Sequence, residues 1–285
     1  GSDNSQYVEH LMDALRDMCE AGLHIRLVLY KTGDDIYTYD ESFLLSARMQ
    51  CRNPRGSFQA RVEYLSKETG VQFAAPHRQM FFENAEKFDL FIYNEDDILI
   101  RLQHVLSFLD ETAKLKERIG QTDFLKFAIG FLRYEIHPVT KQRTQWEHTE
   151  GFQLVTNEKL KGEYITSVDS LHHQGMYMAT REQLLGWKDS CGCFRDPLKD
   201  YPKIATPYFR EFLSSVCLFM HCEISQVIPR DSFQDFTVHH LPNKYLADDT
   251  DSEQSRGSMV NMFVDIADRQ VTIRNNNGFV LKFDD

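Results

Sequence analysis

Patterns typical of amphipathic helices and of buried strands alternate over the first hundred residues of the chain. Residues 6–20 carry apolar side chains at helical spacing, and the β-rich segment 24–30 follows them. The pattern then predicts a helix over 57–69, a short strand over 71–73, a helix over 77–87 and an apolar strand over 88–93. Such alternation is typical of a sheet with helices on both faces. We therefore expect an α/β fold with a mostly parallel central sheet flanked by helices.

The rest of the chain predicts shorter elements. A helix extends from Ile98 to Gly120, a strand lies within 124–136, and 137–170 is polar with turn chemistry. The later elements are a strand over 175–179, a helix capped by Thr180, a helix over 207–220, an acidic loop-like stretch from Asp248 and a hairpin around residues 275–278. No internal repeat or linker interrupts this order. We expect a single domain over residues 1–285 that ends in a small β-hairpin.

The net charge and the cysteine spacing of the chain exclude some classes of function. With 32 Lys and Arg against 43 Asp and Glu, its formal charge is −11. A surface this acidic repels phosphate backbones, which argues against a general nucleic-acid binder but allows a small phosphorylated ligand at a local basic spot. Among the six cysteines, Cys191-Gly-Cys193 lacks the Cys-x-x-Cys spacing of zinc and redox sites. We expect buried thiols and one or two disulfides.

The most informative segment is an apolar strand that leads directly into three carboxylates, Glu95, Asp96 and Asp97. Charged groups at the end of a buried strand are costly unless something pairs with them. A divalent cation is one such partner, and Mn²⁺ or Mg²⁺ suits carboxylate ligands. Ligands of open α/β sheets bind beyond the carboxyl ends of the strands, where these residues fall. The alternative is a solvated acidic turn whose aspartate caps the next helix.

The segment FDLFIYNEDDI, residues 88–98, resembles the metal-binding DxD segment of GT-A glycosyltransferases. In that family a short acidic motif ends a central strand and holds Mn²⁺ against the diphosphate of a nucleotide-sugar donor. The resemblance implies that Asp97 and Glu95 bind the metal and that Glu95 or Asp96 faces the donor ribose. Glu95 stands where the family has its first aspartate, and the family's first strand has no counterpart before residues 6–20.

The resemblance also implies roles for residues outside this segment. His77 and Arg78 match the basic helix start that the family has one element earlier, and Lys31 follows the strand over 24–30. These three residues are expected on the donor side. Glu211, near the start of the helix over 207–220, is the expected general base, and His239 is the expected late metal ligand. Residues 174–186 resemble the family's acceptor-side strand and helix.

The resemblance implies a GT-A-like (Rossmann-like) fold with a donor half over about 1–120, an acceptor half over about 121–247 and a C-terminal extension over 248–285. The expected activity is transfer of a sugar from a UDP- or GDP-sugar to a hydroxyl of a glycan or glycoprotein, with Mn²⁺ or Mg²⁺ as cofactor. The expected location is the lumen of the Golgi or endoplasmic reticulum, as a type II membrane protein with an anchor upstream of Gly1.

Two other functions stay open for the same acidic cluster. The first is a non-catalytic interaction module in which the carboxylates are solvated. The second is a nucleotidyl or phosphoryl transferase that holds two metals on the same carboxylates. Retaining and inverting sugar transfer are both compatible with the sequence. P-loop, zinc-protease and α/β-hydrolase chemistry have no motif in the chain.

Overall fold

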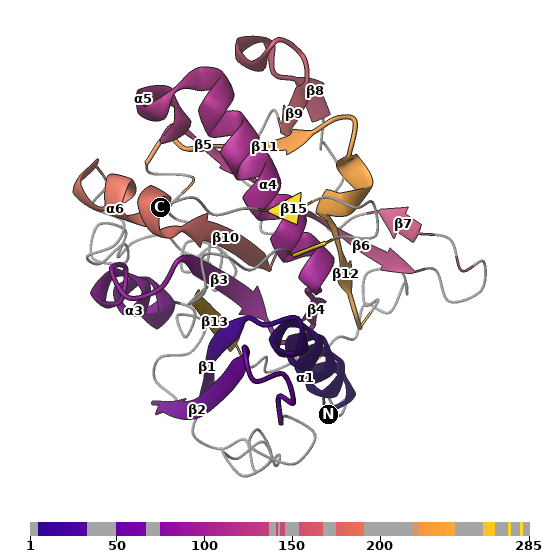
Figure 1. Ribbon diagram of the computed structural model, residues 1–285. Helices are drawn as coiled ribbons and strands as arrows, with labels where there is room; N and C mark the ends of the chain where they lie inside the picture. The colour runs from indigo at the N-terminus through magenta and orange to yellow at the C-terminus, as the bar shows by residue number, and fades with distance from the viewer. Residues whose placement is uncertain are drawn as a thin grey trace.

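A five-stranded mixed sheet carries the acidic segment. In the computed structural model the described residues are 5–32, 50–66, 75–136, 141, 143–145, 154–167, 175–190, 219, 222–242, 259–265, 273–274 and 280–281. The strands of this sheet, in spatial order, are β10 (Met176–Thr180), β3 (Leu90–Glu95), β13 (Met259–Asp265), β1 (His24–Thr32) and β2 (Ser57–Leu65). Figure 1 shows them side by side through the middle of the molecule.

The directions of the strands confirm part of the predicted sheet. β1 and β2 are parallel, whereas the β1–β13, β13–β3 and β3–β10 pairs are antiparallel. Because β1 and β3 are both antiparallel to β13, they run in the same direction and end at the same edge of the sheet. The prediction of a mixed helix-and-strand fold is confirmed. A mostly parallel central sheet is not confirmed, because only the β1–β2 pairing of this sheet is parallel.

Helices cover both faces of this sheet, as the alternation predicted (Figure 1). Leu27 and Leu29 of β1 join a core cluster with the apolar faces of α1 (Ser5–Glu20) and α4 (Leu102–Ile119). The intervening Val28 and Tyr30 join a second cluster with α3 (Pro76–Glu83) and α6 (Arg181–Ser190). Since successive side chains of a strand point to opposite faces, β1 packs against helices on both of its sides.

Two predicted segments are wrong in their secondary structure. The predicted helix over 57–69 is the strand β2 in its described part, and its Phe58, Ala60 and Val62 pack against the core at a period of two residues. The stretch from Asp248, predicted to be loop-like, contains β13, which lies between β1 and β3. The sequence of β13, MVNMFVD, is an apolar run that suits a strand with neighbours on both sides.

Two further sheets complete the core beside α4. One has the order β5 (Phe127–Ile129), β11 (Ser225–Pro229), β9 (Tyr164–Ser167), β8 (Leu154–Thr156), and the other β4 (Ile98–Leu99), β12 (Thr237–His240), β6 (Leu132–Ile136), β7 (Arg143–Gln145). The remaining elements are α5 (Gln121–Phe124), η3 (Glu158–Leu160), η5 (Phe233–Phe236) and the antiparallel pair β14 (Ile273–Arg274) and β15 (Val280–Leu281), where the hairpin was predicted.

The boundaries of several predicted elements agree with the structure. The helix predicted from Ile98 to Gly120 ends where it was predicted to end, before Gly120, but it begins at Leu102, because Ile98 and Leu99 form the short strand β4. The predicted cap Thr180 accepts a hydrogen bond from the backbone N–H of Gln183 at 3.2 Å, while Gln183 Oε1 accepts one from the Thr180 N–H at 3.0 Å. This reciprocal pair is a capping box, which fixes the start of α6.

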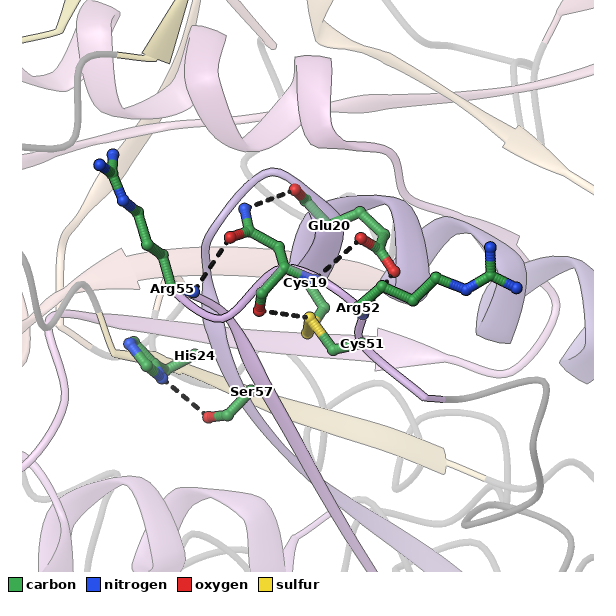
Figure 2. The surroundings of a disulfide bond; sticks show 8 residues. Cys19, Glu20, His24, Cys51, Arg52, Arg55 and Ser57 are labelled. Atoms are coloured by element: carbon green, nitrogen blue, oxygen red, sulfur yellow. Dashed lines mark hydrogen bonds between the residues drawn. A yellow bond between two sulfur atoms is a disulfide. The ribbon is translucent and has the colours of Figure 1, made fainter.

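A disulfide joins the end of α1 to the segment that leads into β2. Cys19 and Cys51 are bonded, and Figure 2 shows Glu20 beside them. The Glu20 carboxylate accepts hydrogen bonds from the backbone N–H groups of Arg52 at 2.7 Å and Asn53 at 3.1 Å. Cys222 is also disulfide-bonded, and no cysteine within the described residues is free. The disulfide and the Glu20 contacts together hold α1 against the sheet edge formed by β2.

Removing the Cys19–Cys51 bond is expected to destabilise the protein. A cross-link over 32 residues restricts the unfolded chain, and a loop of that length corresponds to about 3 to 4 kcal/mol of unfolding free energy. We expect the double variant Cys19→Ala, Cys51→Ala to lose this amount in urea denaturation. Glu20→Gln, which keeps the disulfide and weakens only the contacts to Arg52 and Asn53, should lose less than half as much. Equal losses in the two variants would contradict a separate contribution from the disulfide.

Candidate functional site

The three consecutive carboxylates lie in a buried turn between two sheets. β3 ends at Glu95, Asp96 and Asp97 form the turn, and β4 begins at Ile98. Asp96 and Asp97 are only 3% and 8% exposed. The residue that caps the following helix α4 is Arg101 and not an aspartate. The alternative of a solvated acidic turn that caps a helix is therefore wrong, and these charges need partners within the protein or from a ligand.

His240 lies between two buried carboxylates. Its Nε2 is 3.3 Å from Asp97 Oδ2, and its Nδ1 is 2.6 Å from Glu135 Oε1. The three residues come together because β12 pairs with β4 on one side and with β6 on the other. Burial opposes a charged imidazole, but the hydrogen bonds to Asp97 and Glu135 outweigh it and raise the pKa of His240 above 6.5. Each ring nitrogen that carries a proton donates a hydrogen bond to the carboxylate beside it.

Glu95 faces a second buried cation. Its Oε2 lies 3.8 Å from Nη1 of Arg133, which is 3% exposed, and its Oε1 accepts a hydrogen bond from the Tyr93 hydroxyl at 3.4 Å. Arg133 and Glu135 both belong to β6 and are two residues apart, so both side chains point to the same face of that strand. Strand β6 therefore supplies the acidic turn with the cation Arg133, which faces Glu95, and with the carboxylate of Glu135, which holds His240.

The predicted metal ligand His239 does not meet the acidic turn. Its ring stacks on that of Tyr134, with centroids 5.2 Å apart and planes at 10°. Since neighbouring residues of a strand point to opposite faces, β12 directs His240 and not His239 toward Asp97. Arg133 and Glu135 were missed from the sequence, and of the adjacent pair His239 and His240 the sequence analysis named His239 as the ligand. The signal that indicates Arg133 and Glu135 is that they are charged residues at a period of two within the otherwise apolar strand β6, LRYEI.

The predicted donor-side residues are buried near the same edge of the sheet. His77 Nε2 lies 2.7 Å from the Tyr177 hydroxyl, and the imidazole lies against the ring of Tyr93, with centroids 4.4 Å apart. Burial raises the pKa of Tyr177, and the charge of Arg78 opposes this shift. Arg78 is 2% exposed. The Tyr93 contact links the start of α3 to β3 two residues before Glu95.

Lys31 lies at the end of β1, where its side chain is 4% exposed. It follows Tyr30, which aligns with Met259 of β13, and Met259 aligns with Glu95. Lys31 and the acidic turn are thus at the same edge of the sheet, on strands about 10 Å apart, which is two interstrand spacings. Glu211, the predicted general base, lies outside the described residues.

Gly175 closely approaches Glu95, the first carboxylate of the acidic segment. The Gly175 carbonyl accepts a hydrogen bond from the Glu95 N–H at 2.8 Å. A Cβ at Gly175 would lie 2.9 Å from both Glu95 Oε2 and Ile98 Cγ1, and the residue has a φ of +67°. Only glycine accommodates both the positive φ and the contact.

Gly175→Ala is therefore expected to disturb the turn, and Gly120→Ala provides a matched control. Gly120 also has a positive φ, +77°, but a Cβ there meets nothing within 4 Å. Both variants lose about 1 kcal/mol to backbone strain. Overpacking adds about 1 to 3 kcal/mol at Gly175 alone. Urea denaturation should show this difference, and equal losses would mean that the contact with Glu95 and Ile98 relaxes without cost.

Within the described residues, no group of three or more His, Cys, Asp and Glu side chains is arranged to hold a metal ion. The helices of this part of the chain include none long and apolar enough to cross a membrane. Comparison of the chain with protein-family models, curated proteins and solved structures gives no significant match.

Proposed function

We propose that this chain is a metal-dependent glycosyltransferase of the GT-A type, which transfers a sugar from a nucleoside diphosphate to a hydroxyl acceptor. One observation carries the proposal. Asp97, from the acidic turn after β3, and His240, from a strand far along the chain, direct an oxygen and a nitrogen toward each other at 3.3 Å in a buried site. This arrangement agrees with the resemblance of residues 88–98 to the DxD segment.

The chemistry of Asp97 and His240 supports a divalent cation at the turn. Neighbouring ligands of a six-coordinate Mg²⁺-sized ion are about 3 Å apart, close to the separation of Asp97 Oδ2 and His240 Nε2. Carboxylate and imidazole suit Mn²⁺, and Glu135 holds the far nitrogen of His240 as an outer carboxylate does for a metal-bound histidine. Asp97 and His240 would hold the ion, with Glu95 or Asp96 beside them, and Nε2 of His240 would release its proton when the metal binds. His239 remains a prediction without such support.

The cations at this edge of the sheet suit a diphosphate. A bound divalent ion supplies stabilisation of the negative charge on the departing nucleoside diphosphate. Lys31 would add fixed positive charge from the α1 face of the sheet and Arg78 from the α3 face, and burial would strengthen their effect on a phosphate because water screens them little. His77, held by Tyr177 and Tyr93, orients the start of α3. Together these residues would bind and orient the donor.

Asp97→Asn tests the metal and the donor together. Asparagine keeps the size of the side chain and an acceptor for His240, so the fold should survive, but one charged ligand is lost. We expect Mn²⁺ affinity to fall at least about tenfold, because losing a charged partner costs about 1.5 kcal/mol or more. Thermal stabilisation by Mn²⁺ with UDP or GDP should fall with it.

The matched control for this test is Asp123→Asn, which removes a carboxylate from an exposed pair with Lys126. It should bind Mn²⁺ and nucleotide like the parent. If neither nucleotide stabilises the parent in the presence of Mn²⁺, the transferase proposal fails, and a non-catalytic protein whose buried carboxylates pair with His240 and Arg133 is favoured. If Mn²⁺ binds but the reaction releases pyrophosphate or transfers a nucleotide, the two-metal transferase is favoured instead.

The disulfides support a location in the secretory pathway. Disulfides persist in oxidising compartments and are rare in the cytosol. The Cys19–Cys51 bond and the bonded Cys222 agree with a lumenal protein. A glycan or glycoprotein acceptor is the substrate class that such a compartment supplies.

We propose Glu211 as the general base that accepts the acceptor's proton. In the helix that the sequence predicts over 207–220, Glu211 would lie near the helix N-terminus, which favours the ionised carboxylate that a base needs. Glu211→Gln should lower the rate of sugar transfer by about 100-fold or more, the usual contribution of a general base. Donor affinity, measured by UDP or GDP titration with Mn²⁺, should not change. Transfer at the parental rate would assign the role to another residue or indicate a retaining mechanism.

A further inference from the structure

Asn94 is a fully buried amide in an apolar strand. It is 0% exposed and precedes Glu95 on β3, where alternation directs it to the same face as Leu90 and Ile92. Those two residues belong to the core cluster built on α1 and α4. A buried amide costs about 1 to 3 kcal/mol in folding unless it forms hydrogen bonds. The hydrogen bonds of Asn94 are therefore what allow this amide to be buried.

The amide bridges the two ends of the acidic turn. Asn94 Nδ2 donates to the carbonyl of Glu95 at 2.7 Å and to the carbonyl of Ile98 at 2.9 Å. Because carbonyl oxygens only accept, the two contacts also fix which end of the amide is the nitrogen. Asp96 and Asp97 lie between the two bridged carbonyls. The Oδ1 atom of Asn94 has no hydrogen-bond partner in the described part of the chain. The side-chain hydrogen bonds of Asn94 are therefore the two that its Nδ2 donates.

The bridge acts with two contacts from outside the turn. The Gly175 carbonyl accepts from the Glu95 N–H, and the Asp97 carbonyl accepts from the Leu241 N–H, both at 2.8 Å. These contacts attach the turn to β10 and to the end of β12. Asn94 is the residue that sets the separation of the turn's own ends, and with it the direction of the Asp96 and Asp97 side chains.

We infer that Asn94 is a positioning residue that holds Asp96 and Asp97 in their metal-binding orientation. This inference rests on the proposed metal site in its functional part, although the bridge itself does not depend on any metal. Residues that orient the ligands of a metal typically contribute 10- to 100-fold to its affinity. An apolar residue at position 94 would suit the surrounding core and leave the turn without its bridge.

Asn94→Leu and Gln183→Leu form a matched pair for the test. Gln183 is also 0% exposed, and its amide caps α6 through Thr180, which pairs with Leu90 at the opposite end of β3 from the turn. Both variants replace a buried amide by an apolar side chain of similar size. A merely structural role predicts that both lower stability in urea and that neither changes the folded site.

Two readouts are measured on the folded variants. The first is the dissociation constant for Mn²⁺ alone, which Asn94→Leu should raise about 10- to 100-fold while Gln183→Leu leaves it at the parental value. The second is hydrogen exchange of the Leu241 amide, which reports the Asp97 carbonyl. Asn94→Leu should accelerate it at least about tenfold, and Gln183→Leu should not.

The outcomes separate the inference from the proposed function. If the parent does not bind Mn²⁺, the proposed function fails, and Leu241 exchange alone decides whether Asn94 fixes the turn. If Asn94→Leu matches Gln183→Leu in both readouts, the positioning role is overturned. Asn94→Ala gives a further check should Asn94→Leu not fold, because alanine removes the amide donor without adding bulk to the core. Unchanged Leu241 exchange in that variant would also overturn the inference.

Discussion

The architecture around the acidic turn depends on the balance of charge among buried carboxylates. An isolated ionised carboxylate in an apolar interior is strongly unfavourable, and its partner must come from the protein or from a ligand. Here Asp97 and Glu135 share the imidazole of His240, and Glu95 faces Arg133. Asp97 and His240 are 143 residues apart in the chain. The sheet that joins β4, β12 and β6 is therefore what allows the turn after β3 to be acidic and buried.

The strand β13 controls the other side of the site. It comes from the last part of the chain and lies between β1 and β3, so the strands that carry Lys31 and the acidic turn are two spacings apart. Direct pairing of β1 with β3 would bring them to about 5 Å. The width of the edge at which the donor is proposed to bind is thus set by a segment that the sequence pattern assigned to a C-terminal extension.

Local patterns predicted the elements whose own residues determine them. The helical spacing of α1, the apolar run of β3 and the cap at Thr180 each depend on neighbouring residues, and these predictions are confirmed. The position of Glu95, Asp96 and Asp97 at the end of a buried strand is confirmed for the same reason.

Most of the predictions that failed concern features that depend on pairing between strands far apart in the chain. β2 is an exception, because Phe58, Ala60, Val62 and Tyr64 alternate at a period of two in the sequence itself, and the helix prediction over 57–69 missed this signal. The choice of His240 over His239 depends on the register of β12 against β4, which neither histidine encodes locally. Arg133 and Glu135 come to lie beside Glu95 and His240 only because β6 pairs with β12. Sequence reasoning therefore located the turn but not the side chains that face it.

The three acidic residues alone do not make the site. Three carboxylates on a loose loop would repel one another and extend into water, where they bind a cation weakly. In this chain the turn is anchored by backbone contacts to Gly175 and Leu241 and is bridged internally by Asn94. None of these residues is charged, and each acts through a backbone group or an amide. The carboxylates are thus preorganised by uncharged neighbours, and an acidic triplet has the chemistry proposed here only where such neighbours hold it.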